Sequence, residues 1–307
     1  MPGSGSTIDV RPLAVHIGAE IGGVDLRKPL APDTVTAIRD ALLQWKVVFF
    51  RDQHLNHAQH VAFARQFGDP TPAHVVFGGQ DDEHPEIYSI AKHRTAISTK
   101  DAYAVRPWTG WHTDITAAIN PPMASILRGV TVPPYGGDTQ WTNLAAAFCA
   151  LSPAMQAFIS GLRGVHRFDE PRSPRDLTDY DRAVANRLMV SEHPLVRVHP
   201  ETREKVLYVN PGFLRSITGL TPQEGVHLME MLYEHMIRPE FTVRFRWSEG
   251  AIAFWDNRAT AHLAPTDIFA TEFERQFYRV TLTGDVPVGP DGQPSTALEG
   301  APIEAVG

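Results

Sequence analysis

The sequence predicts a mainly β protein with helical insertions, of the β-sandwich or jelly-roll type. Many short strand-like runs follow residue 111, helices are scattered among them, and the βαβ rhythm of a parallel sheet is absent from the sequence. The sequence also shows no fixed-period repeat and no clear domain boundary. We therefore expect a single domain over residues 8–285, with flexible termini at 1–7 and 286–307.

The first part of the chain predicts two helices around one strand. Apolar residues at helical spacing predict a helix over 33–44, and the apolar run at 47–50 predicts a buried strand. A second helix is predicted over 57–66. Residues 69–110 contain prolines, glycines and charges but little periodicity. We expect long loops there that form a lid or a substrate wall.

Strands predominate in the rest of the chain. The expected strands are 126–132, 138–141, 194–199, 205–210, 241–247, 251–255 and 277–283, and the expected helices are 143–150, 153–162 and 221–237. The runs 194–199 and 205–210 flank a polar turn, which is typical of a hairpin. A Thr-Pro-Gln-Glu capping box begins the last helix.

Composition excludes several classes of protein. The 307 residues are 43% hydrophobic and 21% charged, which is typical of a globular protein with a core. The net charge of −7 disfavours a nucleic-acid binder. No apolar run approaches the length of a membrane span, and the start is not a secretory signal, so we expect a cytoplasmic protein without a membrane partner. The single cysteine, Cys149, lies in an apolar helical run, and we expect it to be buried.

One pair of potential metal ligands lies in the segment 111–116. If this segment is a strand, His112 and Asp114 face the same side and could reach one metal ion. The same spacing of a histidine and an acid occurs at 84–86 and 199–201, and a chain with 14 histidines produces such pairs by chance. Spacing alone therefore does not identify a metal site.

A second histidine follows a predicted strand. His262 comes after the strand 251–255 and a polar segment, so we expect it just past the strand end. Taken alone, a capping or surface histidine is the favoured explanation. Two histidines and one carboxylate would leave three open positions on a metal, which suits non-haem Fe(II). Arg275 and Arg279, four residues apart, offer guanidinium groups for a carboxylate or sulfonate, or are solvated charges at a strand edge.

Several motifs occur together in a characteristic order. They are Trp-His-Thr-Asp at 111–114, Gly-Gly-Asp-Thr at 136–139, Trp-Asp-Asn-Arg-Ala-Thr-Ala-His at 255–262 and the two arginines, with further matches at 22–26, 193–200 and 210–213. From about residue 10 to 285, the chain resembles the taurine dioxygenase/2,4-D dioxygenase (TauD/TfdA) family of Fe(II)- and 2-oxoglutarate-dependent oxygenases. It is similar to the branch that contains alkyl sulfatases and taurine dioxygenases.

The resemblance implies a double-stranded β-helix, the jelly-roll barrel of this family. It implies that His112, Asp114 and His262 hold Fe(II), and that Thr139 and Arg275 bind the distal carboxylate of 2-oxoglutarate. O2 is the second co-substrate. A homo-oligomer, either a dimer or a tetramer, is also implied.

The same resemblance indicates the residues around the primary substrate. These are His74, Phe77, Trp108, Phe168, Phe213 and Arg279, with Arg279 meeting the anionic group. Phe77 stands where taurine-type members have a tyrosine, and Trp108 stands where they have an asparagine. Ordinary core packing explains Phe168 and Phe213 equally well. We expect a pocket more apolar than one built for the ammonium group of taurine.

The resemblance implies hydroxylation of a small organic anion next to a heteroatom, with release of succinate and CO2. An alkyl sulfate ester or alkyl sulfonate is the first expectation, and an aryloxyalkanoate or a specialised metabolite is the alternative. Related halogenases lack the carboxylate that Asp114 supplies, which disfavours halogenation. Two other classes remain open, a zinc-type metallohydrolase and a non-catalytic jelly-roll binding protein. The clamp of Thr139 and Arg275 has no role in either.

Overall fold

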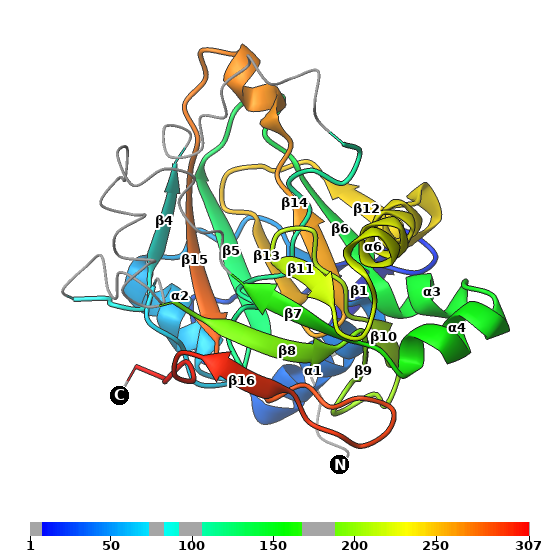
Figure 1. Cartoon of the computed structure of the whole chain (residues 1–307). Coiled ribbons are helices and arrows are strands. Elements are labelled where there is room, and N and C mark those ends of the chain that lie inside the picture. The colour runs from blue at the N-terminus through cyan, green and yellow to red at the C-terminus, as the bar shows by residue number, and fades with distance from the viewer. Residues whose placement is uncertain (1–7, 74–82, 92–105, 168–187, 307) are drawn as a thin grey trace, which may run out of the picture.

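The computed structural model describes residues 8–73, 83–91, 106–167 and 188–306 (Figure 1). The strands are β1 (Asp9–Pro12), β2 (Ala19–Gly22), β3 (Val47–Phe50), β4 (Tyr88–Ala91), β5 (Ala124–Thr131), β6 (Thr139–Asn143), β7 (Arg163–Arg167), β8 (Val190–Pro194), β9 (Val196–Val198), β10 (Lys205–Leu207), β11 (Leu214–Ile217), β12 (Thr242–Phe245), β13 (Ile252–Asp256), β14 (Thr260–Leu263), β15 (Gln276–Leu282) and β16 (Thr296–Glu299). The helices are α1 (Pro32–Trp45), α2 (His57–Ala64), α3 (Leu144–Cys149), α4 (Pro153–Ser160) and α6 (Pro222–Met236), with 3-10 turns at Pro239–Phe241 and Thr266–Ala270.

The described strands form four sheets. The large sheet has seven strands in the order β1-β2-β3-β13-β5-β15-β4, and the small sheet has the order β12-β6-β14. A third sheet, β11-β7-β8-β16, faces the viewer in Figure 1, and β9 pairs with β10 alone. The chain is thus mainly strands with some helices, as the sequence predicts.

The large sheet is buried on both faces, as the side chains of β3 show. Val48 and Phe50 join a core cluster with α1 and α2. Val47 and Phe49 join a cluster on the opposite face, where Phe49 stacks on Phe245 of the small sheet with ring centroids 4.0 Å apart. Burial on both faces explains why β3 is a continuous apolar run, and it confirms the strand predicted over 47–50.

The face of the large sheet that meets the small sheet also carries polar residues. Leu127 and Trp255 belong to the apolar cluster on this face. The strand register places Ser125 opposite Trp255, and Arg279 opposite Leu127. Residues directly opposite one another in antiparallel strands share a face. Ser125 and Arg279 therefore point into the space between the large and small sheets.

Three helices gather at one end of the molecule beside the small sheet (Figure 1). In α6 the predicted capping box is present, because the Thr221 hydroxyl accepts from Glu224 N and the Glu224 carboxylate accepts from Thr221 N. The inner face of α6, including Leu232 and Met236, packs into a cluster with α3 and the β9–β10 hairpin. The predicted helices over 33–44, 57–66, 143–150, 153–162 and 221–237 are confirmed, as is the hairpin.

The segment after Asp285 differs from the expectation of a flexible tail over 286–307. β16 pairs with β8, and Asn120 exchanges two hydrogen bonds with the backbone of Ile303, at 2.9 and 2.8 Å. Ile303 is buried against Ala117 and Ala118. The prolines and glycines form turns that direct residues 286–306 across β8, and one apolar side chain anchors them.

Cys149 also differs from the expectation, because it is exposed. It is the last residue of α3, whose buried side chains include Ala147 and Phe148. Helical periodicity places residue 149 on the outer face. Among the described helices, none combines the length and the apolar character needed to span a bilayer.

Candidate active site

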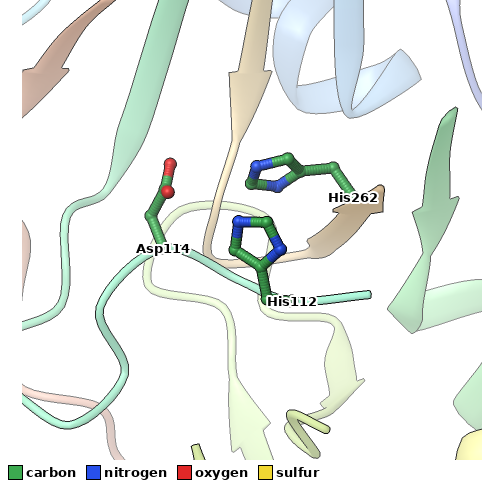
Figure 2. A group of neighbouring side chains, drawn as sticks. All are labelled: His112, Asp114 and His262. Atoms are coloured by element: carbon green, nitrogen blue, oxygen red, sulfur yellow. The ribbon is translucent and has the colours of Figure 1, made fainter. Parts of the chain in front are cut away.

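Three predicted ligands, His112, Asp114 and His262, come together although His262 is far from the other two in the sequence (Figure 2). Each offers one ligand atom, and these atoms all lie within 4.8 Å of one another. His262 lies within β14 rather than past a strand end, so that expectation was wrong. The two imidazole rings are 4.2 Å apart between centroids.

Two backbone hydrogen bonds hold His112 and His262 next to each other. His112 N donates to His262 O at 2.9 Å, and His262 N donates to His112 O at 2.7 Å. This pair is an isolated antiparallel bridge. The strand geometry expected around His112 is therefore limited to this one residue.

A turn, and not a strand, directs Asp114 toward the histidines. The chain turns directly after Thr113, and Ile115 adopts a left-handed φ of 46°. The Asn210 carboxamide holds this turn, since its Nδ2 donates to Thr113 O at 2.9 Å and to Thr116 Oγ1 at 2.7 Å. The Thr113 hydroxyl donates to a backbone carbonyl of β14 at 2.8 Å. The turn is thus tied to two other parts of the fold.

Two donors hold the Asp114 carboxylate. Arg279 Nη1 donates to Oδ1 at 2.7 Å, and Ser125 Oγ donates to Oδ2 at 2.7 Å. Burial by itself would raise the pKa of Asp114, but Arg279 and the two histidines hold it well below its usual value. The carboxylate is therefore ionised and available to a cation.

The two imidazoles are suited to bind a metal. Nδ1 of His112 lies 2.9 Å from Gly110 O, which only accepts, so Nδ1 carries the proton and Nε2 keeps its lone pair. Burial lowers the pKa of His262 to about 3, so this ring is neutral near pH 7. Within the described residues, His262 Nδ1 is buried without a hydrogen-bond partner. Two imidazoles and one carboxylate form a donor set that fits Fe(II).

Arg275 is a buried cation at the edge of the site. Its Nε donates to Gly137 O at 3.3 Å, and its guanidinium lies 3.9 Å from the Phe277 ring centroid. Among the described residues, no carboxylate forms an ion pair with Arg275, and burial lowers its pKa to about 10. Asp267 offsets part of this lowering without forming an ion pair, so the buried guanidinium is suited to bind a carboxylate from a ligand.

Contacts through two aromatic rings connect Thr139 with Arg275. The Trp247 indole N–H donates to Thr139 Oγ1 at 3.0 Å. Trp247 also packs edge-on against Phe277, the ring beneath Arg275, with centroids 4.7 Å apart. Because its oxygen accepts from Trp247, the Thr139 hydroxyl keeps its own proton to donate.

The residues predicted around the substrate are only partly visible. His74, Phe77 and Phe168 lie outside the described residues. Trp108 packs in the core cluster beneath α6, with its ring 5.9 Å from that of Tyr233. Phe213 is half-buried against the cluster that contains Ile303. Their roles at a substrate stay predictions.

Sequence reasoning missed Ser125 and Asn210 as parts of the site. Asn210 lies in a segment that matched the family, but the match assigned it no function. Ser125 is a fully buried hydroxyl within the apolar strand β5, and this was the available signal. A polar residue on the inner side of a buried strand needs a hydrogen-bond partner there.

The strands and this donor set fit a mononuclear, non-haem metal oxygenase. The chain belongs to the family described as "Taurine catabolism dioxygenase TauD, TfdA family", which it matches over residues 9–281. It is accordingly an oxidoreductase, a 2-oxoglutarate-dependent dioxygenase that uses Fe(II), 2-oxoglutarate and O2. The zinc hydrolase and the binding protein are thereby set aside.

Three relatives illustrate the similarity. The chain is 38% identical to an "Alpha-ketoglutarate-dependent sulfate ester dioxygenase" of Pseudomonas putida, covering 93% of each chain. It is 35% identical to an "Alkylsulfatase" of Acinetobacter baylyi, covering 93% of this chain and 88% of the relative. A crystal structure described as a taurine dioxygenase from Burkholderia xenovorans shares 61% identity and a TM-score of 0.85, covering 96% of each chain.

Proposed function

We propose that this enzyme hydroxylates an alkyl sulfate ester at the carbon that carries the ester oxygen. An alkyl sulfonate is the nearest alternative. The observation that supports an anionic substrate best is the state of Arg279. It uses Nη1 for Asp114, while its Nε–H is buried without a partner among the described residues. The names of the relatives from Pseudomonas putida and Acinetobacter baylyi favour a sulfate ester.

His112, Asp114 and His262 would hold Fe(II) in a double-stranded β-helix. When bound, Fe(II) with 2-oxoglutarate and O2 supplies the oxidising power to insert one oxygen atom into a substrate C–H bond. The protein would contribute two imidazoles, of which that of His262 is neutral, and an ionised carboxylate. Three protein ligands would leave positions on the metal for 2-oxoglutarate and O2.

Arg275 and Thr139 would bind the distal carboxylate of 2-oxoglutarate. Arg275 offers the N–H groups that Gly137 O does not use, and Thr139 offers its hydroxyl proton. The buried setting strengthens both interactions, since little water competes there.

Arg279 would orient the sulfate group beside the metal. Hydroxylation of R–CH2–OSO3⁻ gives R–CH(OH)–OSO3⁻, which breaks its C–O bond to sulfate as the hydroxyl loses its proton. The products are an aldehyde and hydrogen sulfate, together with succinate and CO2 from 2-oxoglutarate and O2. A sulfonate would yield an aldehyde and sulfite by the same route.

The cofactor assignment is tested without oxygen. Adding Fe(II) and then 2-oxoglutarate to the metal-free protein should produce the weak visible charge-transfer band of a chelated keto acid. His112→Ala and Arg275→Ala should weaken or abolish this band. Arg238→Ala, at an exposed ion pair with Glu240, is the matched control and should keep it. Fe(II) binding without a band would contradict the 2-oxoglutarate site.

The substrate assignment is tested with a panel of alkyl sulfates, alkyl sulfonates and aryloxyalkanoates. We expect succinate, aldehyde and sulfate in equal amounts from an alkyl sulfate. Arg279→Gln should raise the KM for the sulfate more than for a neutral alcohol of the same chain length. Phenol release from an aryloxyalkanoate, with no sulfate released from esters, would replace the proposal by its alternative.

We also propose a single catalytic domain with a lid-like insertion around 69–110, in a cytoplasmic homo-oligomer. Only the family resemblance supports a dimer or a tetramer. Sedimentation equilibrium of the full chain distinguishes these states from a monomer.

A further inference from the structure

We propose that Ser125 and Asn257 are positioning residues for the Asp114 carboxylate, acting through a chain of hydrogen bonds that begins at Trp255. The proposal rests on the proposed metal role of Asp114 and assigns to Ser125 and Asn257 the function of orienting its carboxylate. It concerns how the protein prepares a ligand before the metal arrives.

The contacts form a continuous line. Trp255 Nε1 donates to Asn257 Oδ1 at 2.8 Å, and Asn257 Nδ2 donates to Ser125 Oγ at 2.9 Å. Ser125 Oγ then donates to Asp114 Oδ2 at 2.7 Å. All four residues are buried. Water is therefore a poor substitute for any of these partners.

The direction of every bond in this line is fixed by chemistry. An indole N–H only donates, so the Asn257 oxygen must face Trp255 and its NH2 group must face Ser125. The Ser125 oxygen then accepts from Asn257. Its single proton is left to point at Asp114 Oδ2, because an ionised carboxylate only accepts.

The backbone builds this line into the large sheet. Trp255 on β13 pairs directly with Ser125 on β5. Asn257 follows β13 in the turn toward β14, and its backbone N donates to Met123 O at 2.9 Å. Asp256 secures the same turn by accepting from the Arg258 guanidinium and from His199. The line therefore starts from rigid elements.

The consequence concerns the plane of the carboxylate. Arg279 holds Oδ1 and Ser125 holds Oδ2, so rotation about the Cβ–Cγ bond would break one of two short hydrogen bonds. Neighbours that orient a ligand typically change metal affinity 10- to 100-fold when they are lost. Ser125 and Asn257 thus hold the Asp114 carboxylate in one orientation in advance, so metal binding does not have to order it.

The test measures Fe(II) affinity of the full chain under anaerobic conditions, with the absorption of the Co(II)-substituted protein as a second readout. Ser125→Ala should weaken Fe(II) binding by roughly 10-fold or more. Ser125→Thr and Ser125→Val add the same bulk, but only threonine keeps the hydroxyl. We expect Thr to bind Fe(II) more tightly than Val by a similar factor. Equal affinities for Thr and Val would overturn the proposal.

A double-mutant cycle tests whether Asn257 acts through Ser125. Asn257→Leu should weaken Fe(II) binding less than Ser125→Ala, and the double variant should bind no more weakly than Ser125→Ala alone. Additive losses would show that Asn257 acts by another route. Circular dichroism and thermal unfolding of the metal-free variants identify any that fail to fold.

His112→Ala separates this proposal from the proposed function. If His112→Ala loses Fe(II) binding while Ser125→Ala binds as tightly as the wild type, only the positioning role fails. If His112→Ala still binds Fe(II) like the wild type, the metal site itself is wrong.

Discussion

At the scale of single residues, Arg275 shows most clearly how a site for a ligand differs from a site built for stability. Its guanidinium is buried, stacked on Phe277 and bonded to one carbonyl. Among the described residues, no carboxylate balances it as an ion pair. A buried charge without an ion-pair partner costs folding free energy, and a bound anion recovers part of that cost.

We therefore expect Arg275→Met to improve stability and impair binding. Removing the unbalanced charge while keeping most of the volume should raise the free energy of unfolding of the ligand-free protein by about 1 kcal/mol. Affinity for 2-oxoglutarate should fall by roughly 100-fold, since a charge-assisted contact is worth about 3 kcal/mol. Urea denaturation and anaerobic titration measure the two effects. A less stable variant with unchanged affinity would contradict both.

How far single residues could be predicted depends on where their partners lie in the sequence. His112 and Asp114 are two residues apart, so their spacing suggested a common role, which the family resemblance then supported. Ser125 and Asn257 become meaningful only when β5 and β13 pair and bring residues 132 positions apart within 2.9 Å. The positions of these two residues in the sequence give no indication of that contact.

At the scale of elements, the turn after Thr113 is held in part by the Asn210 side chain. Asn210 donates to Thr113 O and to Thr116 Oγ1, both within a buried region. We expect Asn210→Ala to lower the free energy of unfolding by about 2–3 kcal/mol, because two buried acceptors lose their donor. Fe(II) affinity should fall as well, since the turn carries Asp114.

Asn56 is the matched control for this substitution. It caps α2 at the surface, where its side chain accepts from Gln59 N at 2.8 Å. Asn56→Ala should cost about 1 kcal/mol and leave Fe(II) affinity unchanged. The same loss of Fe(II) affinity in both variants would mean that stability, and not the turn, controls metal binding.

The segment 286–306 depends on its apolar anchor. Ile303 is buried with Ala117 and Ala118, so Ile303→Asp would bury a charge without a partner. We expect this segment to detach and become sensitive to limited proteolysis, while β5 and β13 stay protected from amide exchange. Leu298→Asp, at an exposed position on β16, should behave like the wild type.

Elements were predictable where their local patterns were strong. The two-sided apolar run of β3 and the capping box of α6 are local, and both were identified correctly. β16 was missed because its four side chains are all exposed, so the strand exists only through its pairing with β8. The turn at Asp114 was missed because its geometry comes from Asn210, almost a hundred positions away.

At the scale of the whole molecule, buried histidines set the response to acid. Burial lowers the pKa of both His60 and His193 to about 3. In the unfolded chain a histidine titrates near 6.5, so between these values the unfolded state binds more protons than the folded state. The contribution of these histidines to the free energy of unfolding is therefore complete above about pH 6.5, and it declines as the pH falls toward 3.

Each such histidine should contribute a slope of about 1.4 kcal/mol per pH unit below its unfolded pKa. Urea denaturation of the metal-free protein at pH 7, 6 and 5 measures this slope. His60 Nε2 lies 3.1 Å from Ile126 O, and His60→Gln keeps a donor for this carbonyl. The variant should reduce the slope by the contribution of one histidine. An unchanged slope in this variant would show that other groups control the acid response.

The reciprocal backbone bonds between His112 and His262 have a consequence for evolution. No side-chain substitution removes those amide and carbonyl groups, except replacement by proline. The distance between these two backbone positions therefore does not depend on which side chains they carry. Descendants of such a chain can therefore exchange the side chains around the metal centre, and so gain new reactions, while these backbone hydrogen bonds are kept.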